Sequence, residues 1–134
     1  MKKFSSQILF ISIIICLFNN CTKRPINGNL DGQWKVLEVS PSPEKTVIKE
    51  NIFYNFQLHV CQLTYYGGYF SDGILNFDGK ILTLDFPYEL TEEDILIFRQ
   101  YGIYENPVTF EVSFPDKKTL LLKNESSIIL CQKY

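Results

Sequence analysis

Runs in which apolar and polar residues alternate cover most of the chain after residue 30, a period of two that is typical of half-buried β-strands. In the first run, residues 32–39, Trp34 and Val36 fall on one face and Lys35 on the other. Further runs occupy residues 51–66, 69–77, 80–86, 108–114, 119–123 and 127–134. The pattern therefore predicts seven strands, with residues 51–66 as one long strand.

Tight turns join most of these strands. Asp78-Gly79 is the strongest hairpin signal, because this dipeptide stands between two runs of strand-like alternation. A meander of strands linked by hairpins can close into an up-and-down antiparallel barrel, which removes its exposed edges. An open sandwich of two sheets is the alternative, and local patterns do not distinguish it from the barrel.

One stretch has helical rather than strand periodicity. Thr91 is a favourable N-cap, and Asp94 occupies the capping-box position three residues later. The sequence predicts a short helix over residues 92–101, between the fourth and fifth strands. Its apolar stripe is expected to dock on the barrel and consists of Ile95, Phe98 and Tyr101.

The N-terminal segment has the composition of a secretory signal peptide. Lys2 and Lys3 precede an apolar run of about eleven residues, against roughly 20 for a membrane-spanning helix. We therefore divide the chain into a signal peptide (1–20), a flexible tether (21–29) and a barrel domain (30–134).

Leu17, four positions before Cys21, resembles the lipobox of bacterial lipoproteins. The resemblance implies that Cys21 becomes the first mature residue and carries the acyl chains, which anchor the protein in the membrane of the cell envelope. Thr22 stands where inner-membrane members of that family carry aspartate, which implies the outer membrane. The alternative is an ordinary signal peptide followed by an incidental cysteine.

The net charge of the domain bears on the kind of partner that it can bind. Without residues 1–20 the chain carries 11 basic side chains against 15 acidic ones, a formal charge of −4. A mildly acidic domain without a basic cluster argues against nucleic-acid binding.

Cys61 and Cys131 remain when the cysteines of the signal peptide and the lipidation site are set aside. An exported protein permits a disulfide between them. Spacing does not show whether their side chains meet, so two buried thiols are the alternative.

Candidate catalytic chemistry is sparse. His59, the one histidine, is expected on the polar face of a strand, with no evident partner for acid–base catalysis. Glu92, Glu93 and Asp94 are explained by the first turn of a helix. The sequence therefore predicts no catalytic residue, no metal site and no cofactor, and the protein is expected not to be an enzyme.

Gly32-x-Trp34, which follows Leu30, resembles the opening motif of lipocalins and lipocalin-like domains. The resemblance covers residues 30–134 and extends to small lipocalin-like lipoproteins of Gram-negative bacteria. It implies an all-β barrel of seven to eight strands in which Trp34 plugs one end. It also implies that a basic residue of the last strand, Lys133, packs across Trp34.

Aromatic side chains are the most ligand-like feature of the domain. They either line an apolar cavity or fill the barrel completely. A cavity predicts a binding module for a small apolar ligand. A solid barrel predicts an interaction or inhibitor protein whose loops contact another envelope protein. The aromatic residues expected to line a cavity are Tyr54, Phe56, Tyr69, Phe77 and Phe98.

Overall fold

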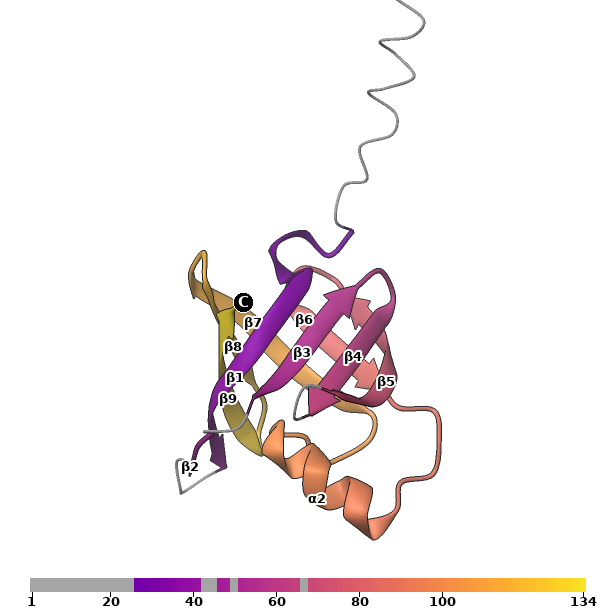
Figure 1. Cartoon of the computed structure of the whole chain (residues 1–134). Helices are drawn as coiled ribbons and strands as arrows, with labels where there is room; N and C mark the ends of the chain where they lie inside the picture. Colours follow the sequence, from indigo (N-terminus) through magenta and orange to yellow (C-terminus); the bar gives the residue numbers. More distant parts are fainter. Residues whose placement is uncertain (1–25, 42–45, 49–50, 66–67) are drawn as a thin grey trace, which may run out of the picture.

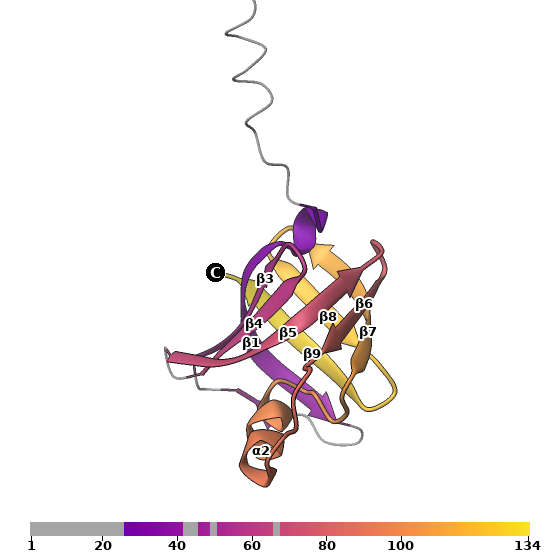
Figure 2. The same ribbon diagram turned by 90° about the vertical axis from the view of Figure 1, so that its right-hand side faces the viewer.

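The computed structural model describes residues 26–41, 46–48, 51–65 and 68–134. Cys21 and the predicted signal peptide lie outside these ranges. The described residues form one antiparallel sheet, a 3-10 helix and an α-helix (Figures 1 and 2). In chain order the elements are η1 (Gly28–Leu30), β1 (Gly32–Pro41), β2 (Thr46–Val47), β3 (Ile52–Gln57), β4 (Val60–Tyr65), β5 (Gly68–Phe77), β6 (Ile81–Asp85), α2 (Glu92–Gln100), β7 (Val108–Asp116), β8 (Thr119–Lys123) and β9 (Ser127–Lys133).

The sheet closes on itself. Strands β3 to β9 follow one another in sequence order, and β1 pairs with both β3 and β9. Eight strands thus form an up-and-down barrel, while the short β2 pairs with the second half of β1. This confirms the predicted all-β barrel and excludes the open sandwich. Figures 1 and 2 place η1 at one end of the barrel and α2 at the other.

The prediction of one long strand over residues 51–66 was wrong. The stretch is a hairpin in which β3 and β4 are joined by a tight turn at Leu58 and His59, with Leu58 at a φ of 54°. No glycine, proline or asparagine marks this turn, so the alternation of apolar residues runs through it. The extra strand also moves α2, which follows the fifth barrel strand rather than the fourth.

The barrel is sealed around Trp34 at the η1 end. The indole Nε1 donates a hydrogen bond of 2.8 Å to the carbonyl of Leu30. The Lys133 ammonium lies 4.7 Å from the centroid of the Trp34 ring and donates to the Asp31 carbonyl over 2.6 Å. A Cβ on Gly32, whose φ is 126°, would lie 2.5 Å from Lys133 Nζ, so this glycine makes room for the lysine.

Helix α2 forms where the capping signals predicted it. Thr91 Oγ1 accepts from the backbone N–H of Asp94, and the Asp94 carboxylate accepts from the backbone N–H of Thr91. This satisfies two of the free N–H groups at the start of the helix. Phe98 and Tyr101 are buried as expected. Ile95 does not dock and is 40% exposed, because it flanks the buried stripe instead of belonging to it.

The end of α2 is fixed to the barrel by hydrogen bonds and close packing. The Tyr101 hydroxyl donates to the carbonyl of Thr64 on β4, and the Tyr54 hydroxyl donates to the carbonyl of Tyr101. Gly102 follows with a φ of 76°, and a Cβ there would lie 2.4 Å from Cγ1 of Ile129. The chain can therefore leave the helix at this point only through a glycine.

The disulfide that the sequence left open is absent, because Cys61 and Cys131 are both buried free thiols. Cys61 lies on β4 and Cys131 on β9, with β1 and β3 between them in the sheet. Three strand spacings measure about 14 Å along the sheet. A disulfide requires Cα atoms within about 7 Å.

We predict that Trp34 and Lys133 stabilise the fold jointly. Trp34→Ala should lower the free energy of unfolding by about 3–5 kcal/mol, because a large buried aromatic leaves a cavity. Lys133→Met should cost about 1–2 kcal/mol through the lost cation–π contact and hydrogen bond. Urea denaturation followed by circular dichroism measures both. An equal cost of Lys133→Met in wild type and in Trp34→Ala would show that the ring contact contributes nothing.

We predict that both core thiols resist alkylation in the folded protein. Burial raises the pKa of Cys61 and of Cys131 well above the ordinary 9.0, so neither forms a thiolate at pH 9. Iodoacetamide followed by peptide mass spectrometry should label these two positions only in denaturant. The unfolded thiols ionise first, so the stability these thiols contribute is present below pH 9 and falls above it. Labelling of either thiol without denaturant would contradict the packing.

Candidate functional site

Within the described residues, side chains of the protein itself occupy the barrel interior. Tyr54 has no accessible surface and Phe56 has 1%. Their rings stack with centroids 5.5 Å apart, and the Tyr101 ring meets Tyr54 edge-on at the same distance. A side chain without accessible surface cannot line a space large enough for a water molecule. The expectation that Tyr54 and Phe56 line a ligand cavity is therefore wrong.

Tyr69 does not line the interior either, because a β-bulge changes the face it occupies. Leu63 pairs with Ser71 and Thr64 pairs with Tyr69, so Phe70 is the extra residue of β5. Phe70 turns inward, with its ring 5.1 Å from that of Phe98, while Tyr69 is 65% exposed. The sequence carries no clear sign of this bulge.

The two remaining aromatic candidates have different surroundings. Phe77, at the other end of β5, is half-buried and packs against the core. Phe98, in contrast, borders a pocket that is formed by described residues.

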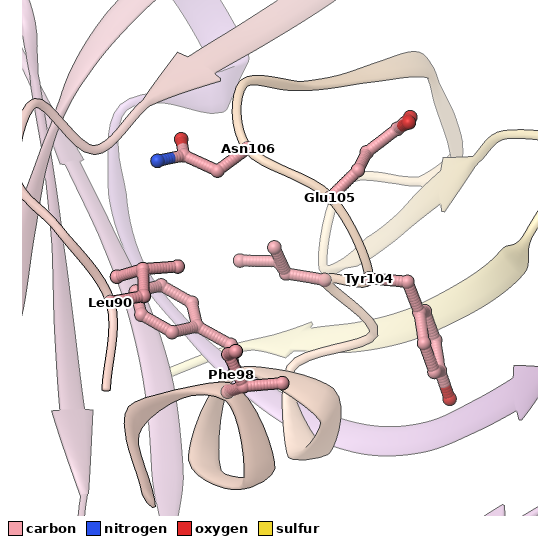
Figure 3. A pocket seen from close by; sticks show the side chains of 7 residues that line it. Leu90, Phe98, Tyr104, Glu105 and Asn106 are labelled. Atoms are coloured by element: carbon pink, nitrogen blue, oxygen red, sulfur yellow. The ribbon is translucent and has the colours of Figure 1, made fainter. Parts of the chain in front are cut away.

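This pocket lies between α2 and the segment that follows it (Figure 3). Helix α2 itself lies at the end of the barrel opposite η1 (Figure 1). The volume of the pocket is about 190 Å³. We call it the α2 pocket, and it is lined by Leu90, Ile95, Phe98, Ile103, Tyr104, Glu105 and Asn106.

Phe98 separates the α2 pocket from the barrel interior. Its ring meets Phe86 at 4.7 Å and Phe70 at 5.1 Å, both in edge-on geometry. In Figure 3 the side chains of Leu90 and Phe98 lie together on one side of the space, with Asn106 across from them. The wall is thus apolar and rests on the aromatic core.

The polar side chains of the α2 pocket either make hydrogen bonds within the protein or lie at the edge of the pocket. The Asn106 amide accepts from the backbone N–H of Phe86 and donates to its carbonyl, so this amide holds the segment against β6 and is not free for a ligand. The Glu105 carboxylate points away from Phe98 in Figure 3. The Arg99 guanidinium lies 6.0 Å from the centroid of the Tyr104 ring. Apolar contact is therefore what the pocket offers, with a carboxylate at its edge.

Sequence reasoning missed most of the pocket. Leu90 directly precedes the predicted N-cap Thr91, but residues 103–106 have no periodic pattern. They reach the site because Gly102 turns the chain and Asn106 fastens it to Phe86.

A second depression lies on the outer face of the barrel and measures about 370 Å³. Asn55, Gln62 and Asp72 are register partners on three adjacent strands and form its polar part. Gln57, Leu58 and Val60 complete its lining.

Groups suited to metal binding or catalysis do not come together in the described residues. No set of three histidine, cysteine or acidic side chains within these ranges is placed to hold a metal ion. His59 is exposed in the turn between β3 and β4, and Asp94 serves as a helix cap. Neither helix in this part of the chain has the length and apolarity to cross a membrane.

Comparison with known proteins agrees with this architecture. No curated protein matches the chain. Two crystal structures are similar to it. One, a lipocalin-like protein from Bacteroides uniformis, has a TM-score of 0.65 at 20% identity over 80% of this chain and 100% of that one. The other, an uncharacterised protein from Bacteroides eggerthii, has a TM-score of 0.58 at 18% identity over 78% of this chain and 98% of that one. The family described as lipocalin-like domain matches residues 15–134, and the chain belongs to this family.

Proposed function

We propose that the protein is a lipid-anchored, non-catalytic binding module of the bacterial cell envelope, whose α2 pocket holds a small apolar group. A lipocalin-like fold suggests a binding module. The observation that carries the proposal is the open, apolar pocket against Phe98, in a barrel whose interior is filled. The binding site therefore lies at the end of the barrel and not inside it.

The volume and lining of the α2 pocket support an apolar occupant. A dry apolar cavity of about 150 Å³ is enough to bind benzene, and the α2 pocket measures about 190 Å³. Leu90, Phe98 and Ile103 supply apolar walls, while the Asn106 amide is already engaged with the backbone of Phe86. Affinity would come from desolvation and fit rather than from hydrogen bonds.

The proposed lipid anchor would determine which way the α2 pocket faces relative to the membrane. Cys21 precedes Ile26, the first described residue, by five positions, which span at most about 17 Å. Ile26 lies beside η1, at the end of the barrel away from α2 (Figure 1). A lipid on Cys21 would hold η1 near the membrane and leave the α2 pocket facing away from it.

The filled interior also favours the second candidate function, an interaction protein with a solid barrel. Ile95 and Leu96 present apolar surface on α2 and are 40% and 62% exposed. Exposed apolar side chains beside a pocket are typical of contact surfaces.

We predict that a small, water-soluble aromatic such as benzyl alcohol stabilises the protein by filling the α2 pocket. Binding to the folded state raises the melting temperature by mass action. Ile95→Asp should abolish this rise, because it places a charge in the apolar wall. Leu96→Asp is the matched control, since Leu96 neighbours Ile95 on α2 but does not line the pocket. Thermal unfolding followed by circular dichroism measures the shift, and equal shifts in both variants would exclude the pocket.

We predict that Cys21 carries the lipid. Metabolic labelling with a palmitate analogue should mark the wild type and Cys16→Ser, because Cys16 lies inside the apolar run. Cys21→Ser should remain unlabelled. Label on Cys21→Ser would exclude the anchor.

A further inference from the structure

Acidic side chains are concentrated in the segment of the chain that forms the α2 pocket. We call residues 85–106 the α2 end, which carries six acidic side chains and one basic side chain, Arg99. The net charge of −5 exceeds the −4 of residues 21–134 as a whole, so the rest of the domain is close to neutral. The six acidic residues are Asp85, Glu89, Glu92, Glu93, Asp94 and Glu105.

Several of these carboxylates are close to the pocket in sequence or in space. Glu105 lines it, Glu89 precedes the lining residue Leu90, and Glu92 and Glu93 lie in the helical turn before Ile95. The positive end of the α2 dipole offsets about half a charge, and Asp94 is engaged in the capping box. Glu89, Glu92, Glu93 and Glu105 are exposed, and Glu105 lines the pocket, so the surface of the α2 end stays negative.

Apolar surface extends past the mouth of the pocket. Ile95 and Tyr104 line it and are also exposed, and Leu96 is the next residue along α2. A small molecule that fills about 190 Å³ would leave much of this surface in water. It would also gain nothing from the carboxylates unless it were charged.

We propose that the α2 pocket receives an apolar side chain of a basic polypeptide segment, whose flanking cations face the carboxylates of the α2 end. The inference rests on the proposed function, because it requires an apolar group in the α2 pocket. Charge complementarity favours a cationic partner, because carboxylates make binding more favourable for cations and less favourable for anions. A polypeptide also covers Ile95, Leu96 and Tyr104 beyond the inserted side chain.

The test uses the full chain in nanodiscs of zwitterionic lipid, which give a basic peptide no electrostatic attraction to the membrane. The probe is a fluorescent five-residue peptide with one phenylalanine flanked by two lysines on each side. One control peptide replaces the lysines with glutamates, and another replaces the phenylalanine with alanine. Fluorescence polarisation should show binding of the first peptide, at least tenfold weaker binding of both controls, and weaker binding in high salt.

Protein variants test the contribution of the carboxylates separately from that of the apolar wall of the pocket. Each rim carboxylate is worth about a two- to fivefold change in affinity, the range of exposed ion pairs. Glu93→Gln combined with Glu105→Gln should therefore weaken binding of the lysine peptide about four- to twenty-fivefold. Glu111→Gln is the control for the single variant Glu105→Gln, because it likewise removes one negative charge, from the exposed face of β7. Ile95→Asp should abolish insertion of the phenylalanine, whereas Ile74→Asp, which changes an exposed apolar residue of β5 outside the pocket, should retain it.

The outcomes distinguish this inference from the proposed function. Stabilisation by benzyl alcohol without preference for the lysine peptide would keep the pocket and overturn the basic partner. Phenethylamine binding as tightly as the lysine peptide would also overturn the inference, since a small cation would then suffice. Equal loss of affinity in Glu111→Gln and in Glu105→Gln would overturn the contact between the peptide's cations and the α2 end. If neither the alcohol nor the peptide binds, the proposed function fails as well.

Discussion

The antiparallel pairing of β1 with β9 is the interaction on which the rest of the structure depends. It joins residues 86 to 99 positions apart, from Trp34 with Lys133 to Pro41 with Ser127. The register shifts between Val36 and Glu38, and a bulge of this kind bends a strand, which helps a sheet of eight strands to close. Once closed, the barrel has an inside and an outside, and every alternating strand acquires a definite buried face.

The two ends of the barrel are closed in different ways. At the η1 end the polar atoms of Trp34 and Lys133 are satisfied by the carbonyls of Leu30 and Asp31. At the α2 end the closure depends on Tyr101, which packs inside the barrel and donates to β4. The α2 helix is short and would be marginal alone, so its docking through Phe98 and Tyr101 keeps it formed. The segment after Gly102 bridges the helix and β6 and leaves the α2 pocket between them.

Aromatic residues decide where a ligand can bind. The stacked rings of Tyr54 and Phe56 and the edge-on rings of Phe70, Phe86 and Phe98 occupy the space that a hollow barrel would offer. In the proposed function, binding takes place on the outer side of Phe98, where solvent and carboxylates are within reach. A site at a rim can combine apolar contact with charge, whereas a buried interior would have to be neutral because unpaired charges are costly there.

Much of the fold was determined by the sequence itself. The period of two in strands such as β7, the Asp78-Gly79 turn and the Thr91–Asp94 capping box are local signals, and local chemistry suffices to form them. Gly32-x-Trp34 also pointed to Lys133 as the partner of Trp34. Tertiary structure decided the rest. The turn at Leu58 lacks a turn residue and is held by the Asn27 amide, 31 positions away. The bulge at Phe70 is set by pairing with β4, and the α2 pocket exists because Gly102 and Asn106 bring an aperiodic segment against β6. These features arise from contacts between distant residues, which no local pattern of hydrophobic and polar positions encodes.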